Sequence, residues 1–268
     1  MGGVNYTQYV ERLLPHAAHA DLAQYGTLRE NDRDYPLFRL TVDGPRWLVL
    51  TAGFHGEEPA GPLTLLEYFP EIARAARARG VGLRVYPCIN PSGFEAGTRY
   101  NASGEKPNND FLRYEIAPGV WTGELPDDGQ FLRHALYDGG PKETRAIRDE
   151  LTRYPAPAAA LDIHQDDHIP GPLTYAYTFG DKEAYRPLMR AASAHAPVAI
   201  DCFVDDERRT DPDGLVEFHD GSVTDYYARL GVPYLATLET TTATPLAQCH
   251  AINLLWIHGF IELAARSQ

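Results

Sequence analysis

One strand-like run is almost entirely apolar, and it restricts the fold more than any other feature of this chain. The segment RWLVLTAGF, residues 46–54, has the composition of a strand that is buried on both faces of a sheet. A segment with helical spacing follows at residues 62–80 and ends at Gly80, which suits a helix C-cap. LRVYPCI, residues 83–89, is the next expected strand. Strands that alternate with helices predict a mostly parallel sheet covered on both faces.

The alternation continues along the chain. Further strands are expected at residues 36–42, 158–164, 198–204 and 234–239, and further helices at residues 6–19, 142–154, 181–195, 222–230 and 245–266. Residues 90–140 are rich in Gly, Pro, Asn and Asp and are expected to form long loops with little regular structure. Because no repeat or linker interrupts the chain, the sequence predicts a single α/β domain over residues 1–268. Its central sheet is expected to be mixed and mostly parallel, with helices on both faces.

Composition and charge exclude several classes of partner. Of the 268 residues, 44% are hydrophobic and 23% charged, as in ordinary globular proteins. The formal net charge of −13 argues against a nucleic-acid partner or an anionic membrane, since both require a basic surface. No secretory signal opens the chain, and no apolar run approaches the ~18 residues that span a bilayer. We therefore expect a cytoplasmic protein without a membrane partner. Buried, reduced thiols are expected for the three widely spaced cysteines, Cys88, Cys202 and Cys249.

Three of the expected strands end in residues that could serve a metal. His55 and Glu58 follow the first apolar strand in GFHGEE, His164 ends LDIH, and Glu239 ends TLE. Ligands bind beyond the carboxyl ends of strands in α/β sheets. Catalytic zinc takes three protein ligands of nitrogen or oxygen type and leaves a position for water. The pattern therefore predicts a zinc site of His55, Glu58 and His164, with Glu239 left off the metal to accept a proton from the water.

The order of these motifs resembles the zinc carboxypeptidases of the carboxypeptidase A type, a group that also includes aspartoacylase and succinylglutamate desuccinylase. The resemblance covers about residues 47–240, and it implies a phosphorylase/hydrolase-like α/β fold. His55 and Glu58 match the family's H-x-x-E zinc pair, and His164 in DIH matches its third ligand. Glu239, with the segment GSVTDYYARLGVPYLATLE before it, matches the family's general acid/base.

A further part of the resemblance concerns the stabilisation of charge. NPSGF, residues 90–94, matches the family's N-P-[DS]-G-[FY] segment. Arg99 follows where the family has an arginine that polarises the scissile carbonyl and holds the developing oxyanion. Together with zinc, Arg99 would meet the charge of the tetrahedral intermediate where it forms.

The sequence departs from the family at the residues that bind substrate. Carboxypeptidases of this type carry an Asn-Arg pair that grips the terminal carboxylate, whereas this chain has Asn108 and Asn109 in KPNNDF. An amide lacks the charged bidentate fork of arginine. Substitutes within reach include Arg208, in the loop before the last catalytic strand, and His219, near the place of the family's mobile tyrosine, which is missing. We therefore expect Asn108, Asn109, Arg208 and His219 to contact substrate.

A second metal remains an alternative to an ordinary polar loop at Asp166, Asp167 and His168, directly after the third predicted ligand. Glu57 also adds negative charge, which would favour cationic or amine-bearing substrates if it faces the site.

The functional prediction is a cytoplasmic zinc metallopeptidase that hydrolyses an amide bond of a peptide or acyl-amino-acid substrate with metal-activated water. One alternative is an N-acyl amino acid deacylase of the aspartoacylase or succinylglutamate desuccinylase type. Another is an inactive metal-binding module, which predicts the loss of a ligand or of Glu239, and all four residues are present. The sequence does not indicate the substrate's side chain or the oligomeric state.

Overall fold

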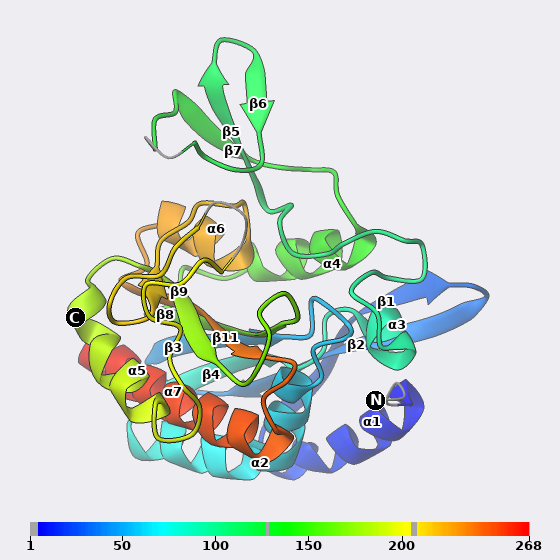
Figure 1. The fold of residues 1–268 in the computed structure, drawn as a ribbon. Helices are drawn as coiled ribbons and strands as arrows, with labels where there is room; N and C mark the ends of the chain where they lie inside the picture. Colours follow the sequence, from blue (N-terminus) through cyan, green and yellow to red (C-terminus); the bar gives the residue numbers. More distant parts are fainter. Residues whose placement is uncertain (1–4, 127–128, 205–207, 268) are drawn as a thin grey trace.

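A central eight-stranded sheet organises the molecule (Figure 1). The computed structural model describes residues 5–126, 129–204 and 208–267. The strand order is β1-β2-β4-β3-β8-β11-β9-β10. The bounds are β1 Asp21–Glu30, β2 Arg33–Val42, β3 Arg46–Ala52, β4 Val81–Tyr86, β8 Ala159–Asp166, β9 Thr174–Phe179, β10 Leu215–Val216 and β11 Tyr234–Thr241.

Strands β4, β3, β8 and β11 form a continuous parallel core, and antiparallel pairs flank it on both sides. The predicted mixed, mostly parallel α/β sheet is confirmed. The extension of one catalytic domain over residues 1–268 stays a prediction.

Helices cover both faces of this sheet (Figure 1). Helices α2, α5 and α7 pack on one face and α4 and α6 on the other, as the two hydrophobic clusters show. The bounds are α1 Tyr6–Leu13, α2 Ala60–Ala78, α3 Pro91–Ala96, α4 Lys142–Leu151, α5 Arg186–Ala192, α6 Val223–Arg229 and α7 Leu246–Arg266. Short 3₁₀ helices follow α1 at Leu14–Ala18 and precede α5 at Lys182–Ala184.

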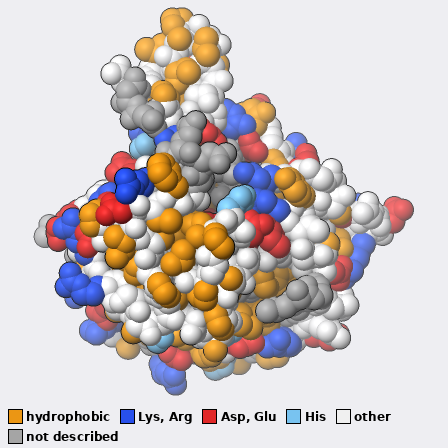
Figure 2. All heavy atoms as spheres, viewed as in Figure 1, with side chains coloured by type: hydrophobic (Ala, Val, Ile, Leu, Met, Phe, Trp, Pro, Cys, Tyr) orange, Lys and Arg blue, Asp and Glu red, His pale blue; other side chains and the backbone are white. Residues whose placement is uncertain are grey.

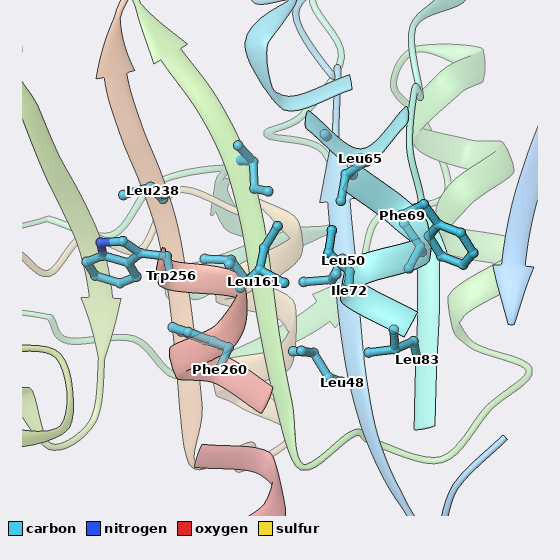
Figure 3. Packing of buried hydrophobic residues seen from close by; sticks show 14 of the residues in the cluster. Leu48, Leu50, Leu65, Phe69, Ile72, Leu83, Leu161, Leu238, Trp256 and Phe260 are labelled. Atoms are coloured by element: carbon cyan, nitrogen blue, oxygen red, sulfur yellow. The ribbon is translucent and has the colours of Figure 1, made fainter. Parts of the chain in front are cut away.

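The apolar run that predicted β3 is buried on both faces because its side chains alternate between the two layers. Leu48 and Leu50 belong to the cluster beneath α2 and α7, whereas Val49 belongs to the cluster beneath α4 and α6. Figure 3 shows Leu48 and Leu50 near Leu161 and the aromatic rings of α7. A strand buried in this way cannot shift its register without exposing apolar side chains, so the residues at its carboxyl end are held in place.

Residues 90–140 contain more regular structure than predicted. Helix α3 follows β4, and a second sheet of order β6-β5-β7 forms from Leu112–Ala117, Val120–Thr122 and Arg133–Leu136. This sheet projects from the body as an arm (Figure 1). The prediction of long loops was wrong here because the strands are short and largely exposed, so they lack a continuous apolar run. Figure 2 shows the many hydrophobic side chains on the arm, and the exposed ones include Ile116, Val120, Trp121, Leu132 and Leu136.

Two further predictions need correction. The strand expected at residues 198–204 is absent, and Val198 forms only an isolated bridge to Thr174. Strand β1 was missed because most of its side chains are exposed or half-buried, which obscures the apolar pattern.

All three cysteines are unpaired, as predicted, but only Cys88 and Cys249 are buried, whereas Cys202 is half-buried. Among the described residues, no helix combines the length and hydropathy needed to cross a membrane.

Candidate metal centre

The sheet brings the predicted metal ligands together at the carboxyl ends of three adjacent strands. Strands β3, β8 and β11 are neighbours, and the register pairs His164 of β8 directly with Glu239 of β11. His55 lies three residues beyond the end of β3, whose last residue, Ala52, pairs with Ile163. Residues from distant parts of the sequence therefore meet at one edge of the parallel core.

His55, Glu58 and His164 form a buried group, called the metal group below. One ligand atom from each lies within 4.8 Å of the others, and all three residues are buried. The Nδ1 atom of His55 is 2.7 Å from Glu58 Oε1, and the Nδ1 atom of His164 is 2.8 Å from Glu58 Oε2. Two imidazole nitrogens thus point at one carboxylate, an arrangement that requires protons or a cation between them.

A carboxylate fixes the orientation of His164. The Nε2 atom of His164 lies 2.9 Å from Asp162 Oδ2, and Thr51 donates a hydrogen bond of 2.7 Å to Asp162 Oδ1. A carboxylate on the far nitrogen of a metal-binding histidine sets the ring's tautomer and increases its basicity. Among the described residues, His55 has no such partner on its Nε2 atom.

Charge shifts the pKa values within the metal group in opposite directions. Burial alone would raise the pKa of Glu58, but the two imidazoles hold it well below its usual range. Burial alone would lower the pKa of His164, but the carboxylates of Asp162 and Glu58 raise it well above its ordinary value. Burial lowers the pKa of His55, and Glu58 opposes that shift. The group therefore concentrates negative charge on Glu58, where a cation would bind.

Glu58 has two further hydrogen-bond donors that set its position. The backbone N–H of Gln165 donates to Glu58 Oε2 at 3.1 Å, and Arg99 Nη1 donates to Glu58 Oε1 at 3.3 Å. The side chain of Gln165 also accepts from the N–H of Ala60, which anchors the start of α2 beside the metal group. The carboxylate is thus held by the neighbouring strand as well as by its own loop.

Arg99 reaches the metal group from the loop after α3. Its Nη1 atom also donates to Glu57 Oε1 at 3.1 Å, so Glu57 faces Arg99. The Asn90 side chain supports this loop, because its Nδ2 atom donates to the carbonyl oxygen of Phe54 and more weakly to that of Arg99. Asn90 therefore ties the arginine loop to the loop that carries His55.

A close backbone contact explains why glycine occurs at position 56, in the loop that carries His55, and at position 93, in α3. A Cβ atom on Gly56 would lie 1.9 Å from the carbonyl carbon of Gly93, and one on Gly93 would lie 2.5 Å from Asn90 Nδ2. Any larger residue at Gly56 would push the loop between His55 and Glu58 away from α3.

Glu239 is buried beside the metal group without belonging to it. Among the described residues, its Oε2 atom has no hydrogen-bond partner. Burial raises the pKa of Glu239 well above its ordinary value, with Glu58 and Asp166 adding to the shift and His164 and Arg99 opposing it. A carboxyl group with a free oxygen and a raised pKa suits the exchange of a proton.

A cavity of about 220 Å³ opens above these residues. Its lining includes the metal group, Arg99 and Glu239, together with His168, Tyr175 and Tyr177. Asn108 and Asn109 line it as well, whereas Arg208 and His219 line a neighbouring hollow. Phe218 lines both, and the Arg208 guanidinium lies 4.0 Å above its ring. The structure therefore places two of the four predicted substrate-binding residues in the cavity and two in the neighbouring hollow.

Asn109, which stands where the resemblance leads one to expect an arginine, is paired with an acid. Its Nδ2 atom donates a hydrogen bond of 2.6 Å to Asp220 Oδ2. His219 is likewise engaged, with Nδ1 2.6 Å from Asp225 Oδ1. Neither residue provides a free positive charge in the cavity.

The second acidic cluster is the loop of Asp166, Asp167 and His168, whose ligand atoms also lie within 4.8 Å of one another. Asp166 already accepts hydrogen bonds on both oxygens, from the backbone N–H of His168 at 2.6 Å and from the Tyr175 hydroxyl at 2.8 Å. The loop is held without an ion, and a second metal stays a prediction.

Sequence reasoning missed several residues of the site. Asp162 lies two residues before His164 on the same strand, so the period of two could have placed both on one face. Gln165 could also have been singled out, as the residue directly after the ligand. Glu124 and Asp220 line the cavity from loops distant in sequence, and no local pattern marks them.

Comparisons with solved structures identify the fold. A candidate metallopeptidase from Shewanella amazonensis is 22% identical, with a TM-score of 0.71, and the match covers 96% of this chain and 91% of the other. A metallo-carboxypeptidase from Burkholderia cenocepacia is 15% identical with a TM-score of 0.61, over 96% of this chain and 67% of that one. Bovine thrombin-activatable fibrinolysis inhibitor, solved with a tick carboxypeptidase inhibitor, is 15% identical with a TM-score of 0.63, and the match covers 98% of this chain and 95% of the other.

No family model matches the sequence, and no curated protein matches it either. The structural matches extend over nearly the whole chain and agree with the resemblance found in the motifs. The chain has the fold of the metallopeptidases and metallo-carboxypeptidases of the carboxypeptidase A type.

Proposed function

We propose that the chain is a zinc-dependent metallopeptidase, similar to the metallocarboxypeptidases, that hydrolyses an amide bond with metal-activated water. The observation that carries this proposal is the convergence of two imidazoles and one carboxylate beside a buried, uncommitted carboxyl group, Glu239. A structural site would use four protein ligands, whereas three leave a position for water.

The residues present fit zinc. His55, Glu58 and His164 supply the nitrogen and oxygen donors that zinc takes in hydrolases, and Asp162 provides the carboxylate behind a ligand histidine. When bound, zinc lowers the pKa of a water to about 7 and polarises a carbonyl group.

Glu239 is the proposed general base. Its free Oε2 atom can accept a proton from the attacking water, and its raised pKa helps it keep that proton until the leaving nitrogen takes it. Because Glu239 pairs with His164 in the strand register, the base and one ligand keep a fixed separation.

Arg99 is the proposed electrostatic partner of the reacting carbonyl oxygen. Its hydrogen bonds to Glu57 and Glu58 are both donated by Nη1, and a guanidinium carries five N–H donors. The remaining donors can meet an oxyanion that develops in the cavity. Glu57 supports this role by holding the guanidinium in place.

The cavity also limits what the protein accepts. A volume of about 220 Å³ is below the ~300 Å³ at which pockets for drug-sized ligands begin. The end of a peptide, or a small acylated amine, fits such a volume better than a long internal segment of a chain. The proposed substrate is therefore an amide next to a terminal residue.

Metal analysis and a substrate screen test the proposal. Purified protein should contain one zinc per chain by mass spectrometry, and the zinc-loaded protein should release terminal residues from short peptides. A panel of N-acyl amino acids, tested in parallel, separates the deacylase alternative from the peptidase. A chain that binds zinc and cleaves neither panel would contradict the proposed function and favour a binding module.

A further inference from the structure

We infer that one wall of the cavity binds a positively charged group of the substrate, either a primary ammonium or a guanidinium. This wall is formed by Asn108, Asn109, Glu124 and Asp220. This set is called the acceptor wall below. The inference rests on the proposed function, because the group bound here is a part of the amide that is cleaved.

An unpaired buried acceptor is the first observation. Asn108 is only 7% exposed and lines the cavity, yet its Oδ1 atom has no hydrogen-bond partner among the residues that the structure describes. Leaving a buried carbonyl oxygen unpaired is unfavourable, because the oxygen loses its bonds to water and gains none in return. Its backbone also adopts φ of +129°, a conformation that side chains rarely take. A donor from a ligand would relieve the first of these costs.

Uncompensated negative charge is the second observation. Asp220 accepts from Asn109 Nδ2 and, at 3.0 Å, from the backbone N–H of Ser222. Both donors are neutral, so the charge of Asp220 is not cancelled, and a carboxylate has about four acceptor positions. Glu124 lines the same cavity and carries a second negative charge.

Arg113, which lies on the other side of this wall, already has acceptors of its own. Arg113 lines a second hollow that shares Asn109, Glu124 and Asp220 with the first. Its guanidinium is engaged by the Asp110 carboxylate and by the carbonyl oxygens of Asn109 and Leu112.

The chemistry of the wall selects an organic cation. An ammonium has three N–H donors and no acceptor, which matches a wall of carbonyl and carboxylate oxygens. Within the described part of the chain, Glu124 and Asp220 are not members of a group of three closely spaced ligand atoms, which disfavours a metal ion. A substrate carboxylate at this place would face two like charges, which is unfavourable.

Lys106 is the competing feature. It also lines the cavity and is exposed. If Lys106 rather than the acceptor wall recognised the substrate, the preferred charge would be negative. The two readings therefore predict opposite preferences.

The test uses zinc-loaded protein and three series of benzoylglycyl amides, whose leaving amines have two to five carbons. The far end of the amine is an ammonium, a methyl group or a carboxylate. We expect kcat/KM to be about tenfold or more higher for the best ammonium-ended amide than for its methyl-ended match, because a charge-assisted bond is worth more than a neutral one. The carboxylate-ended amides should be the poorest substrates.

Two variants test whether the acceptor wall or Lys106 determines the preferred charge. Asp220→Asn keeps a partner for Asn109 but removes the charge, and should reduce the ratio of kcat/KM for the ammonium-ended amide to kcat/KM for its methyl-ended match about tenfold. Lys106→Gln, the matched control, should not weaken cleavage of the ammonium-ended amide. Preference for the carboxylate end, or an Asp220→Asn variant with its ammonium preference intact, would overturn the inference.

Calorimetry separates this inference from the proposed function. Zinc-loaded Glu239→Gln protein should bind the ammonium-ended amide more tightly than the methyl-ended one without turnover. Suppose that the unaltered protein cleaves no amide, while the Glu239→Gln protein shows this binding preference and loses it when Asp220→Asn is added. In that case the inference holds and the proposed function fails. Equal binding of the two ends would overturn the inference.

Discussion

The metal group and the acceptor wall lie in the same cavity, but the protein holds them by different means. His55 and Glu58 follow the buried strand β3, and His164 lies near the end of the buried strand β8. Backbone and side-chain hydrogen bonds hold Glu58 and His164 in place. The acceptor wall comes from loop residues on either side of β5 and β6, at positions 108, 109 and 124, and from Asp220, and it includes an unpaired oxygen and a residue with positive φ. The contrast indicates that the fold fixes the positions of the proposed metal ligands, whereas loop residues form the proposed binding surface for the substrate.

The largest effect is expected from Glu239→Gln. If Glu239 is the base, kcat should fall by about 10²- to 10⁴-fold, because the amide cannot accept a proton. Zinc content should remain at one per chain, since Glu239 is not a proposed ligand. Parallel measurement of kcat and zinc content checks this, and full activity in the variant would remove Glu239 from the mechanism.

Arg99→Lys should be the next largest change. Loss of a donor to the oxyanion costs about 10²- to 10³-fold in kcat, and a lysine at this position retains the charge but not the fork of donors. We expect kcat to fall more than KM rises. Steady-state kinetics on the best substrate of the panel separates the effect on kcat from the effect on KM. A change confined to KM would assign Arg99 to ground-state binding instead.

Asp162→Asn should weaken zinc without abolishing its binding. The carboxylate orients His164, and removing such a partner typically reduces metal affinity by about 10- to 100-fold. Competition with a chelator of known affinity measures the change. Zinc affinity equal to that of the unaltered protein would show that the β8 strand alone orients the histidine.

The strand-end residues could be predicted from the sequence, whereas the acceptor wall could not. His55, His164 and Glu239 each follow an apolar run, and the carboxyl ends of parallel strands converge, so a local pattern was sufficient to propose that they meet. Asp220 and Asn109 form a hydrogen bond across 111 positions of the sequence, between loops with no periodic signal. Arg208 and His219, which were predicted to contact substrate, line the neighbouring hollow, and Phe218 lines both that hollow and the cavity.

The smallest expected effect is on stability, and it concerns Asp220. Burial raises the pKa of Asp220 to about 6 from an ordinary value of 3.8, and Asp225 and Glu124 contribute to the rise. A carboxyl group that holds its proton more tightly when folded favours the folded state at low pH. The folded state then loses stability as pH rises from about 4 through about 6.

The Asp220→Asn variant should therefore be more stable than the unaltered protein at pH 7.5, by about 1 to 2 kcal/mol in the free energy of unfolding. This figure is reduced to account for the partial exposure of Asp220. Near pH 3.5 the two proteins should be equally stable. Denaturant unfolding of both metal-free proteins across this range checks the prediction. A variant that is less stable at pH 7.5 would show that the charge of Asp220 is compensated in the folded protein.

The most direct test of the account is a crystal structure of the zinc-loaded protein with anomalous data collected at the zinc edge. We predict one peak at the metal group, within about 2.0 to 2.2 Å of His55 Nδ1, His164 Nδ1 and a carboxylate oxygen of Glu58, with Glu239 off the metal. A zinc peak elsewhere, for example on the loop of Asp166, Asp167 and His168, with none at the metal group, would contradict it.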